Sequence, residues 1–166
     1  KNSNVAPIRE TLAAGILDIA RVKHFSTVYD PFCGSGTFLI ESALRAANIP
    51  PGINRAFSAE NWDSVPKKIW KEEREAALSQ VRQDIEFKGY GSDIDINAVL
   101  LSKTNAKKAV VFSNLYFTQK GIEEFSPSTE KGIVVCNPPY GERMLEQKQA
   151  EDIYKAMGRA FKFKDG

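Results

Sequence analysis

The stretch Asp30-Pro31-Phe32-Cys33-Gly34-Ser35-Gly36-Thr37 decides the fold class that this sequence predicts. The run from Ser26 to Asp30 leads into it and predicts a short strand, and apolar residues at helical spacing follow from Thr37 to about Ala47. A glycine-bearing turn between a strand and a helix is where an open α/β sheet binds its ligands. The stretch therefore predicts an α/β fold and marks a first candidate site.

Two nucleotide-binding motifs are incomplete in this loop. A phosphate-binding P-loop needs a Lys before its Ser or Thr, but Gly36 precedes Thr37, and a dinucleotide fingerprint needs a third Gly or Ala where Leu39 stands. The carboxylate of Asp30 would repel phosphate but would accept hydrogen bonds from an ammonium group. The loop is therefore suited to a cationic ligand. The alternative is a structural turn in which Asp30 only caps the following helix.

A second motif, Gly91-Ser92-Asp93-Ile94-Asp95, repeats the order of strand, carboxylate and helix start. An acidic residue that ends the second strand of a doubly wound sheet accepts hydrogen bonds from the two hydroxyls of a ribose. Asp93 is the candidate for that contact. Asp95 lies just before a helical run and is expected to cap its N-terminus.

A third motif, Asn137-Pro138-Pro139-Tyr140, follows the apolar run Gly132-Ile133-Val134-Val135-Cys136, which predicts a fully buried strand. A proline pair cannot continue a sheet, so it holds the chain extended at the carboxyl edge. There the amide oxygen of Asn137 and the carbonyl of Pro138 could accept both hydrogens of an exocyclic amino group, with Tyr140 stacking on a flipped base. The alternative is a rigid turn with a buried tyrosine.

The rest of the chain alternates between helical spacing and short strand-like runs, which favours a doubly wound, mostly parallel sheet. The first predicted helix covers residues 7–22, with a buried face made of Ile8, Leu12, Ile16, Ile19 and Ala20. A second long helix is expected from Pro66 to about Glu86, with Ile69, Ala76, Val81 and Ile85 on one face. Further strands are predicted at residues 88–92 and 115–119, and further helices at residues 96–108 and 150–163.

Composition excludes several classes of protein. The 166 residues include 23 basic and 21 acidic side chains, two Cys and one His, which is too few cysteines and histidines for a disulfide framework or a zinc site. No apolar run approaches the roughly 20 residues that span a bilayer, so a cytoplasmic protein without a membrane or metal site is expected. A net charge of +2 is low for a protein that binds nucleic acid by itself.

Taken together, the three motifs resemble those of S-adenosylmethionine-dependent methyltransferases that modify exocyclic amino groups of bases. More narrowly, the segments Ala6-Pro7-Ile8-Arg9-Glu10-Thr11-Leu12-Ala13-Ala14 and Asn48-Ile49-Pro50-Pro51-Gly52-Ile53-Asn54-Arg55 resemble the THUMP-associated RNA methylase family. Relatives of that family methylate the guanine 2-amino group in large-subunit ribosomal RNA. The resemblance implies a Rossmann-like class I methyltransferase fold, S-adenosylmethionine as cofactor, S-adenosylhomocysteine as product and RNA as partner.

Carried over position by position, the resemblance implies two sets of site residues. The expected cofactor-binding residues are Arg9, Glu10, Thr11, Asp30, Pro31, Phe32, Cys33, Gly34, Gly36, Thr37, Asp93, Ile94 and Asn137. The expected catalytic residues are Asn137, Pro138, Pro139 and Tyr140. Relatives often have an Asp after the third strand to accept from the adenine amino group, and this chain has Gly121 there. Backbone groups or Glu123 are the alternatives for that contact.

The resemblance also divides the chain into four parts. Residues 1–25 would form an N-terminal helix, 26–48 the cofactor loop and helix, 49–87 a helical insertion, and 88–166 a second half that stops before the fifth strand. An RNA-binding module is expected N-terminal to the chain. The alternative functions are a DNA methyltransferase acting on adenine or cytosine amino groups, and a non-catalytic fragment that binds cofactor or RNA.

Three further residue types carry weaker expectations. Cys33 and Cys136 are expected to lie near each other as small buried residues rather than as a redox pair. His24 lies outside every motif and is expected at the surface. Arg143 either contacts a phosphate or pairs with Glu142 or Glu146.

Overall fold

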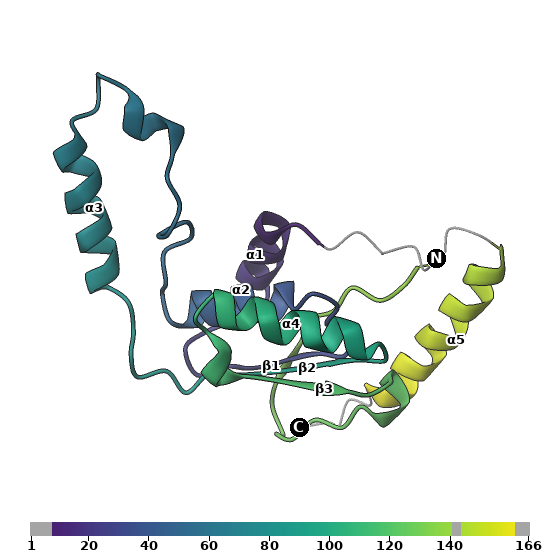
Figure 1. The fold of residues 1–166 in the computed structure, drawn as a ribbon. Coiled ribbons are helices and arrows are strands. Elements are labelled where there is room, and N and C mark those ends of the chain that lie inside the picture. The colour runs from purple at the N-terminus through teal and green to yellow at the C-terminus, as the bar shows by residue number, and fades with distance from the viewer. Residues whose placement is uncertain (1–7, 141–143, 162–166) are drawn as a thin grey trace.

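The protein is built around a four-stranded parallel sheet with the strand order β3-β2-β1-β4 (Figure 1). The computed structural model describes residues 8–140 and 144–161. The strands are β1 (Thr27–Asp30), β2 (Lys88–Asp93), β3 (Leu115–Gln119) and β4 (Ile133–Val134). Because β2 and β3 lie on one side of β1 and β4 on the other, the order reverses beside β1, as it does at the ligand site of a doubly wound sheet. The predicted fold class is confirmed.

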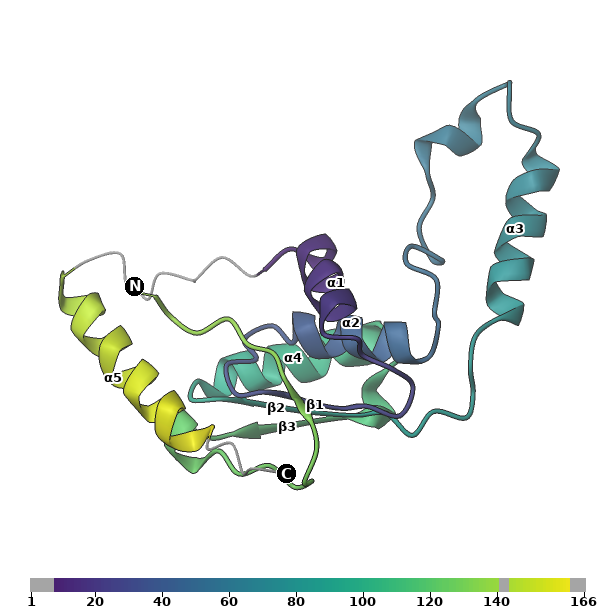
Figure 2. The same ribbon diagram turned by 180° about the vertical axis from the view of Figure 1, so that it is seen from behind.

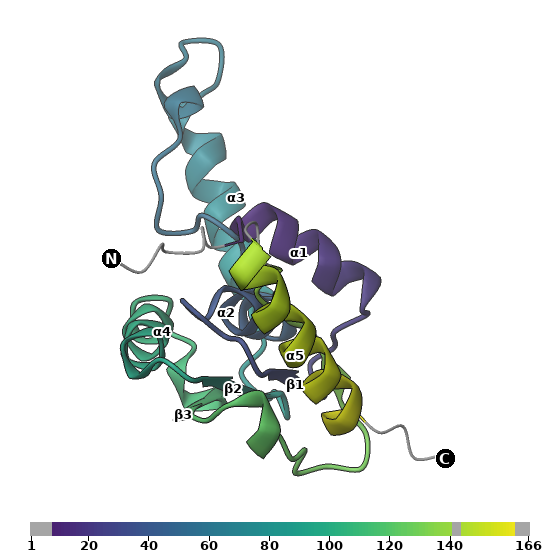
Figure 3. The ribbon, with the colours of Figure 1, turned by 90° about the vertical axis from the view of Figure 1, so that its right-hand side faces the viewer.

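Five α-helices and three short 3-10 helices are present among the described residues. The α-helices are α1 (Glu10–Ile19), α2 (Thr37–Ala46), α3 (Lys67–Ser79), α4 (Ile96–Lys108) and α5 (Met144–Ala160), and the 3-10 helices are η1 (Ser58–Asn61), η2 (Phe112–Asn114) and η3 (Ile122–Glu124). Figure 3 shows α1, α2 and α4 on one side of β1, β2 and β3, with η3 and the segment after it on the other. α5 packs against η3.

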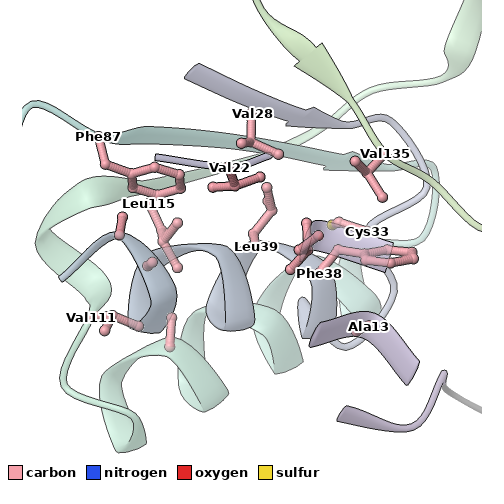
Figure 4. Close-up of a cluster of buried hydrophobic side chains, with 14 of the residues drawn as sticks. Ala13, Val22, Val28, Cys33, Phe38, Leu39, Phe87, Val111, Leu115 and Val135 are labelled. Atoms are coloured by element: carbon pink, nitrogen blue, oxygen red, sulfur yellow. The ribbon is translucent and has the colours of Figure 1, made fainter. Parts of the chain in front are cut away.

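The core lies between the sheet and the α1, α2 and α4 layer (Figure 4). Phe38 and Leu39 of α2 are buried against β1 and β2. Close packing depends on Gly91, because a Cβ there would come within 2.8 Å of Leu39 Cδ1 and 2.7 Å of Phe117 Cδ1. The bare backbone of β2 therefore lets α2 approach the sheet, which in turn positions the loop that precedes α2.

The segment between α2 and β2, which contains η1 and α3, forms an arm that stands away from the sheet (Figures 1 and 2), while Ile49, Ile85 and Phe87 at its ends pack on the core. The predicted helix from Pro66 to Glu86 is too long, since α3 ends at Ser79, and none of its residues is buried. Inside the arm, Arg74 donates to the carbonyls of Ile53 at 2.7 Å and Arg55 at 2.8 Å. Ile69 of the expected apolar face is 45% exposed, whereas Ile85, beyond the end of α3, packs against the core.

Three other expectations need correction. The helix predicted at residues 7–22 covers only Glu10–Ile19, and Leu12 and Ile19 of its expected buried face are 57% and 84% exposed. Ala13 and Leu17 are fully buried instead, on the side of α1 that contacts α2. The strand expected to be fully buried is a two-residue edge strand with Val134 41% exposed. The last helix begins at Met144 rather than near Ala150.

None of the helices in the described ranges combines the length and the apolar character needed to cross a membrane.

Candidate functional site

The first two motifs meet at the carboxyl edge of the sheet. The backbone N–H of Cys33 donates to the carbonyl of Ser92 at 2.9 Å, and the N–H of Gly34 donates to Oδ2 of Asp93 at 3.0 Å. The loop after β1 is thus tied to the end of β2 by one main-chain and one charge-assisted hydrogen bond. The two motifs therefore lie side by side at this edge.

Two glycines shape this loop. Gly34 and Gly36 have φ angles of +50° and +84°, in the left-handed region that favours glycine. Gly36 is the N-cap residue of α2, and a Cβ on it would lie 2.9 Å from the Cβ of Ser102 in α4. Asn105 of α4 donates through Nδ2 to the carbonyl of Ser35 at 3.0 Å. One side of the loop therefore packs against α4, and the N-terminus of α2 remains available to a ligand.

Asp30 is almost fully buried, with 2% of its surface exposed. Burial raises the pKa of its carboxyl to about 7, a hydrogen bond from the N–H of Phe32 at 3.1 Å lowers it, and the nearby charge of Asp93 raises it further. Its side chain does not cap α2, so the capping alternative is wrong. A cationic group next to this carboxyl would favour its ionised form, and the carboxylate would in turn hold that cation.

Both cysteines flank Asp30. Burial raises the pKa of the Cys33 thiol to about 12 and that of the Cys136 thiol to about 11, and the charge of Asp30 contributes to both shifts. Cys33 is buried and Cys136 is half-buried. The thiols thus both lie near the Asp30 carboxyl group and remain protonated near neutral pH. Protonated thiols are poor nucleophiles, which agrees with a packing role.

Asp93 holds two loops at once. Besides accepting from Gly34, its carboxylate accepts through Oδ1 from the N–H of Asp95 at 3.0 Å. Asp95 caps α4 by accepting from the N–H of Asn97 at 2.8 Å, which confirms its predicted role. Ile94 between them is 77% exposed, and Gln119 fixes its carbonyl with a 3.1 Å hydrogen bond. The apolar side chain of Ile94 is therefore exposed to solvent next to the fixed carboxylate of Asp93.

The third motif continues from β4 at the same edge. The N–H of Val135 donates to the carbonyl of Tyr29 at 3.0 Å, and Cys136, beside Asp30, comes directly before Asn137. Asn137 and Pro139 are exposed and Pro138 is half-buried. Tyr140 is 60% exposed, so the alternative of a buried tyrosine in a rigid turn is wrong. The motif thus begins one residue after Cys136, which lies near the Asp30 carboxyl, and its Asn137 and Tyr140 side chains are open to solvent.

The turn after β3 lies next to Asp93, because the N–H of Lys120 donates to the Asp93 carbonyl at 3.1 Å. Gly121 follows, and a Cβ at this position would lie 2.8 Å from Oε2 of Glu123. Glu124 accepts from the N–H of Gly121 at 3.3 Å. The carboxylate of Glu123 thus occupies the space beside Gly121 that a side chain at position 121 would otherwise fill.

Other expected residues take different positions. Arg9, Glu10 and Thr11 are exposed at the start of α1, where Glu10 adds to the raised pKa of Glu41, a shift caused mainly by partial burial. His24 pairs with Arg82 at 2.8 Å at the base of the arm. Arg143, Glu142 and the question of their pairing lie outside the described residues. No group of three metal-ligating side chains occurs in the ranges that the structure covers.

A surface groove of about 440 Å³ lies away from this edge, between α1, α2 and the base of the arm. Two of its cationic side chains, Arg45 and Arg82, have protein partners. Arg45 pairs with Asp18 and donates to the carbonyl of Val22 at 3.2 Å, and Arg82 pairs with His24. The Arg45 contacts join α2 to the end of α1, and the Arg82 contact joins the arm to the segment before β1.

Sequence reasoning missed Ser102, Asn105 and Gln119, which support the loops from α4 and β3. Small and amide side chains are common on helices and strand ends. Only the three-dimensional packing reveals which of them reaches a loop far away in the sequence.

Known proteins resemble this chain over nearly its full length. It is 41% identical over 156 residues to "Putative RNA methyltransferase YpsC" of Bacillus subtilis, covering 94% of this chain and 40% of that protein. It is 41% identical over 162 residues to "Ribosomal RNA large subunit methyltransferase K/L" of Shewanella baltica, covering 95% of this chain and 23% of that protein. The chain therefore spans less than half the length of these two relatives.

The fold comparison agrees with the sequence comparison. The crystal structure of "SMU.472, a putative methyltransferase complexed with SAH" superposes with a TM-score of 0.89 at 35% identity, over 94% of this chain and 41% of that one. The family model described as "RMKL-like, methyltransferase domain" matches residues 1–164. Together with the site at the carboxyl edge, these matches show that the chain belongs to the RMKL-like methyltransferase domain family.

Proposed function

We propose that this chain transfers a methyl group from S-adenosylmethionine to the exocyclic amino group of a base in RNA, specifically the 2-amino group of guanine in ribosomal RNA. One observation carries the proposal: Asp30, Asp93 and Cys136, which comes directly before Asn137, lie together at one edge of the sheet. Residues suited to bind the cofactor thus lie next to residues suited to bind the target base. Such proximity is what a direct transfer between two bound molecules requires.

The residues present fit this cofactor. S-adenosylmethionine carries an ammonium group and a sulfonium, and Asp30 offers a buried carboxyl whose pKa of about 7 lets such cations favour the charged form. Each oxygen of the Asp93 carboxylate accepts one backbone N–H and retains a second lone pair for a ribose hydroxyl. The exposed Ile94 side chain supplies an apolar surface for adenine. When bound, the cofactor supplies an electrophilic methyl group.

Glu123 is our candidate for the adenine amino contact that Gly121 cannot make. Its Oε2 lies where a side chain at position 121 would begin, and the same turn is bonded to the Asp93 carbonyl. A carboxylate at this place can accept a hydrogen bond from the adenine amino group. The chain would thus retain the acceptor while moving it two residues along the sequence.

The Asn137 amide oxygen and the Pro138 carbonyl would act on the target base. The amine lone pair of a base is delocalised into the ring, which makes the nitrogen a poor nucleophile. Two fixed acceptors draw the N–H₂ group toward tetrahedral geometry and stabilise the positive charge that grows on nitrogen. Tyr140 would stack on the base, which its 60% exposure allows. The reaction then needs no strong general base, because the methylated amine loses its proton readily to water.

RNA is favoured over DNA by the relatives, whose printed names specify RNA and ribosomal RNA. The motif itself suits adenine or cytosine amino groups of DNA equally well, which keeps a DNA methyltransferase as the second candidate. A net charge of +2 favours an arrangement in which much of the RNA affinity resides in parts of a longer protein outside this chain. We expect such a protein to act in the cytoplasm.

Isothermal titration of the full-length protein with S-adenosylmethionine tests the cofactor half of this proposal. Binding should persist in an Asn137→Ala variant and should weaken at least tenfold in a Glu123→Gln variant with unchanged thermal stability. The amide introduced by Glu123→Gln has the same length as the carboxylate it replaces, so the loss reports the carboxylate charge. Absence of binding by the unaltered protein would favour the non-catalytic alternative.

A further inference from the structure

Three tyrosines stand side by side on the face of the sheet opposite α1, α2 and α4. Tyr29, Tyr90 and Tyr116 occupy matching register positions on β1, β2 and β3. The ring centroids of Tyr29 and Tyr90 are 5.4 Å apart with a 17° interplanar angle, and those of Tyr90 and Tyr116 are 5.1 Å apart at 18°. These residues form a tyrosine stack, in which three nearly parallel rings cross the strands.

The two ends of the tyrosine stack differ. Tyr29 is 4% exposed, its hydroxyl accepts from the N–H of Ser128 at 3.0 Å, and Phe125 packs edge-on against its ring at 5.8 Å. The segment that leads into β4 therefore closes this end. Tyr116 is 48% exposed and lies on β3, which is an edge strand. The stack consequently ends in an aromatic ring that is open to solvent.

The residues around the open end are polar or basic. Side chains alternate along a strand, so Lys88 and Ser92 share the face of Tyr90, and Thr118 shares the face of Tyr116. A parallel-sheet face that a second protein layer covers is normally rich in Val, Ile and Leu. The opposite face follows that rule with Leu115 and Phe117. The composition around Tyr116 therefore favours a polar partner with flat rings over another layer of protein.

We propose that the open end of the tyrosine stack binds a base of single-stranded RNA, with Lys88 contacting the adjoining phosphate. Nucleobases stack on aromatic side chains whatever their sequence, and a lysine beside the stack attracts the backbone. Tyr90 and Asp93 lie three residues apart on β2, or about 10 Å at the rise of a strand. An RNA strand held at Tyr116 is thus close to the cofactor edge. This inference rests on the proposed function and adds a docking surface outside the base site.

Binding of a short fluorescein-labelled oligouridylate to the full-length protein, followed by anisotropy, tests the proposal. Tyr116→Ala should weaken binding about tenfold, and Tyr116→Phe should bind within twofold of the unaltered protein because the ring remains. Lys88→Ala should reduce the slope of log affinity against log salt by about 0.7, the value for one phosphate contact on a single strand. Trp62→Ala is the control, since Trp62 is 61% exposed but lies in the arm; it should leave affinity unchanged.

Equal affinity of the Tyr116→Ala variant and the unaltered protein would overturn the proposal. Hydroxyl-radical footprinting gives an independent readout, in which Tyr116 should be oxidised in the free protein and protected by RNA. Protection already in the free full-length protein would mean that polypeptide covers the stack, and would also overturn it. The test separates the two claims, because Asn137→Ala should abolish methyl transfer while leaving Tyr116-dependent binding intact. Tyr116-dependent binding without any methyl transfer by the unaltered protein would contradict only the proposed reaction.

Discussion

The Asp93 carboxylate accepts a hydrogen bond from the backbone N–H of Gly34 at 3.0 Å, which joins two segments 59 residues apart in the sequence. The same carboxylate accepts from the N–H of Asp95. One side chain thus fixes the loop before α2 and the start of α4 relative to each other. The predictions below follow from this junction and from the sheet that supports it.

Replacing Asp93 with Asn should weaken S-adenosylmethionine binding by tenfold or more. The amide keeps the shape of the side chain, but it replaces one carboxylate oxygen, which accepts a hydrogen bond from a backbone N–H, with an NH₂ group that cannot accept one. Hydrogen bonds to charged groups contribute about 1.5–3 kcal/mol each. Calorimetric titration measures the loss. Asp95→Asn is the matched control, because Asn is an equally good N-cap residue for α4. Equal affinity in both variants would show that the Asp93 charge has no part in binding.

Stability should fall as the pH rises from about 4 to about 7. The pKa of the Asp30 carboxyl is about 7 in the folded protein, against about 3.9 in an unfolded chain, so the folded state holds this proton more tightly. The contribution of this proton to the free energy of unfolding is complete at pH values below the pKa of the unfolded chain. It is lost as the pH rises through the pKa of the folded protein, a change of up to about 4 kcal/mol. Urea unfolding across this pH range measures the change.

Asp30→Asn supplies the control for that experiment, since the amide resembles the protonated carboxyl. The variant should lose this pH dependence and should be more stable than the unaltered protein at pH 8. It should also bind the cationic cofactor more weakly. A variant with the same pH profile as the unaltered protein would show that another group is responsible.

Val110→Gly should stabilise the protein by about 1 kcal/mol. Val110 follows the end of α4 with a φ of +59°, a left-handed conformation that costs a β-branched residue about 1–2 kcal/mol. Its side chain is 79% exposed, so little packing is lost. Asn48→Gly is the comparison at the end of α2, and it should not stabilise the protein, because Asn tolerates φ of +53° and its Nδ2 donates to the carbonyl of Gln80 at 3.0 Å. A lower unfolding midpoint for Val110→Gly would contradict this account.

Gly91→Ala and Gly15→Ala should have opposite effects on the free energy of unfolding. The new methyl group at position 91 meets Leu39 and Phe117 at under 3 Å, and such overpacking costs about 1–3 kcal/mol. Position 15 lies in α1 with no atom within 4 Å of the new Cβ, so the higher helix propensity of Ala should add about 1 kcal/mol. Denaturant unfolding of both variants checks the pair.

Sequence patterns predicted most of the elements that carry the site. β2, β3 and α4 follow local signals, such as Asp95 as a cap, and the meeting of Asp30 with Asp93 follows from the common direction of parallel strands. The buried face of α1 was predicted in part, because Ile8, Ile16 and Ala20 pack against the core whereas Leu12 and Ile19 do not. Ala13 and Leu17 are buried instead of Leu12 and Ile19 because α2 approaches closely there, which is a property of the packing.

The lengths of α3 and β4 also depend on tertiary contacts. The N–H of Arg82 bonds to the carbonyl of Ala47, which draws the chain back to the base of the arm and ends the helical run before it. β4 pairs with β1 at only two positions, so the strand is shorter than its run of apolar residues. The supports from Ser102 and Asn105 reach the loop from a helix about 70 residues later, and no local pattern encodes that distance.

Methyl transfer by the full-length protein tests the central claim most directly. The measurement is incorporation of labelled methyl from S-adenosylmethionine into unmodified large-subunit ribosomal RNA, compared with duplex DNA, for the unaltered protein and for Asn137→Ala. We predict label on the guanine 2-amino group of the RNA alone, and a loss of at least a hundredfold in the variant despite normal cofactor binding. Label on duplex DNA instead of RNA, or full activity of the variant, would contradict the account.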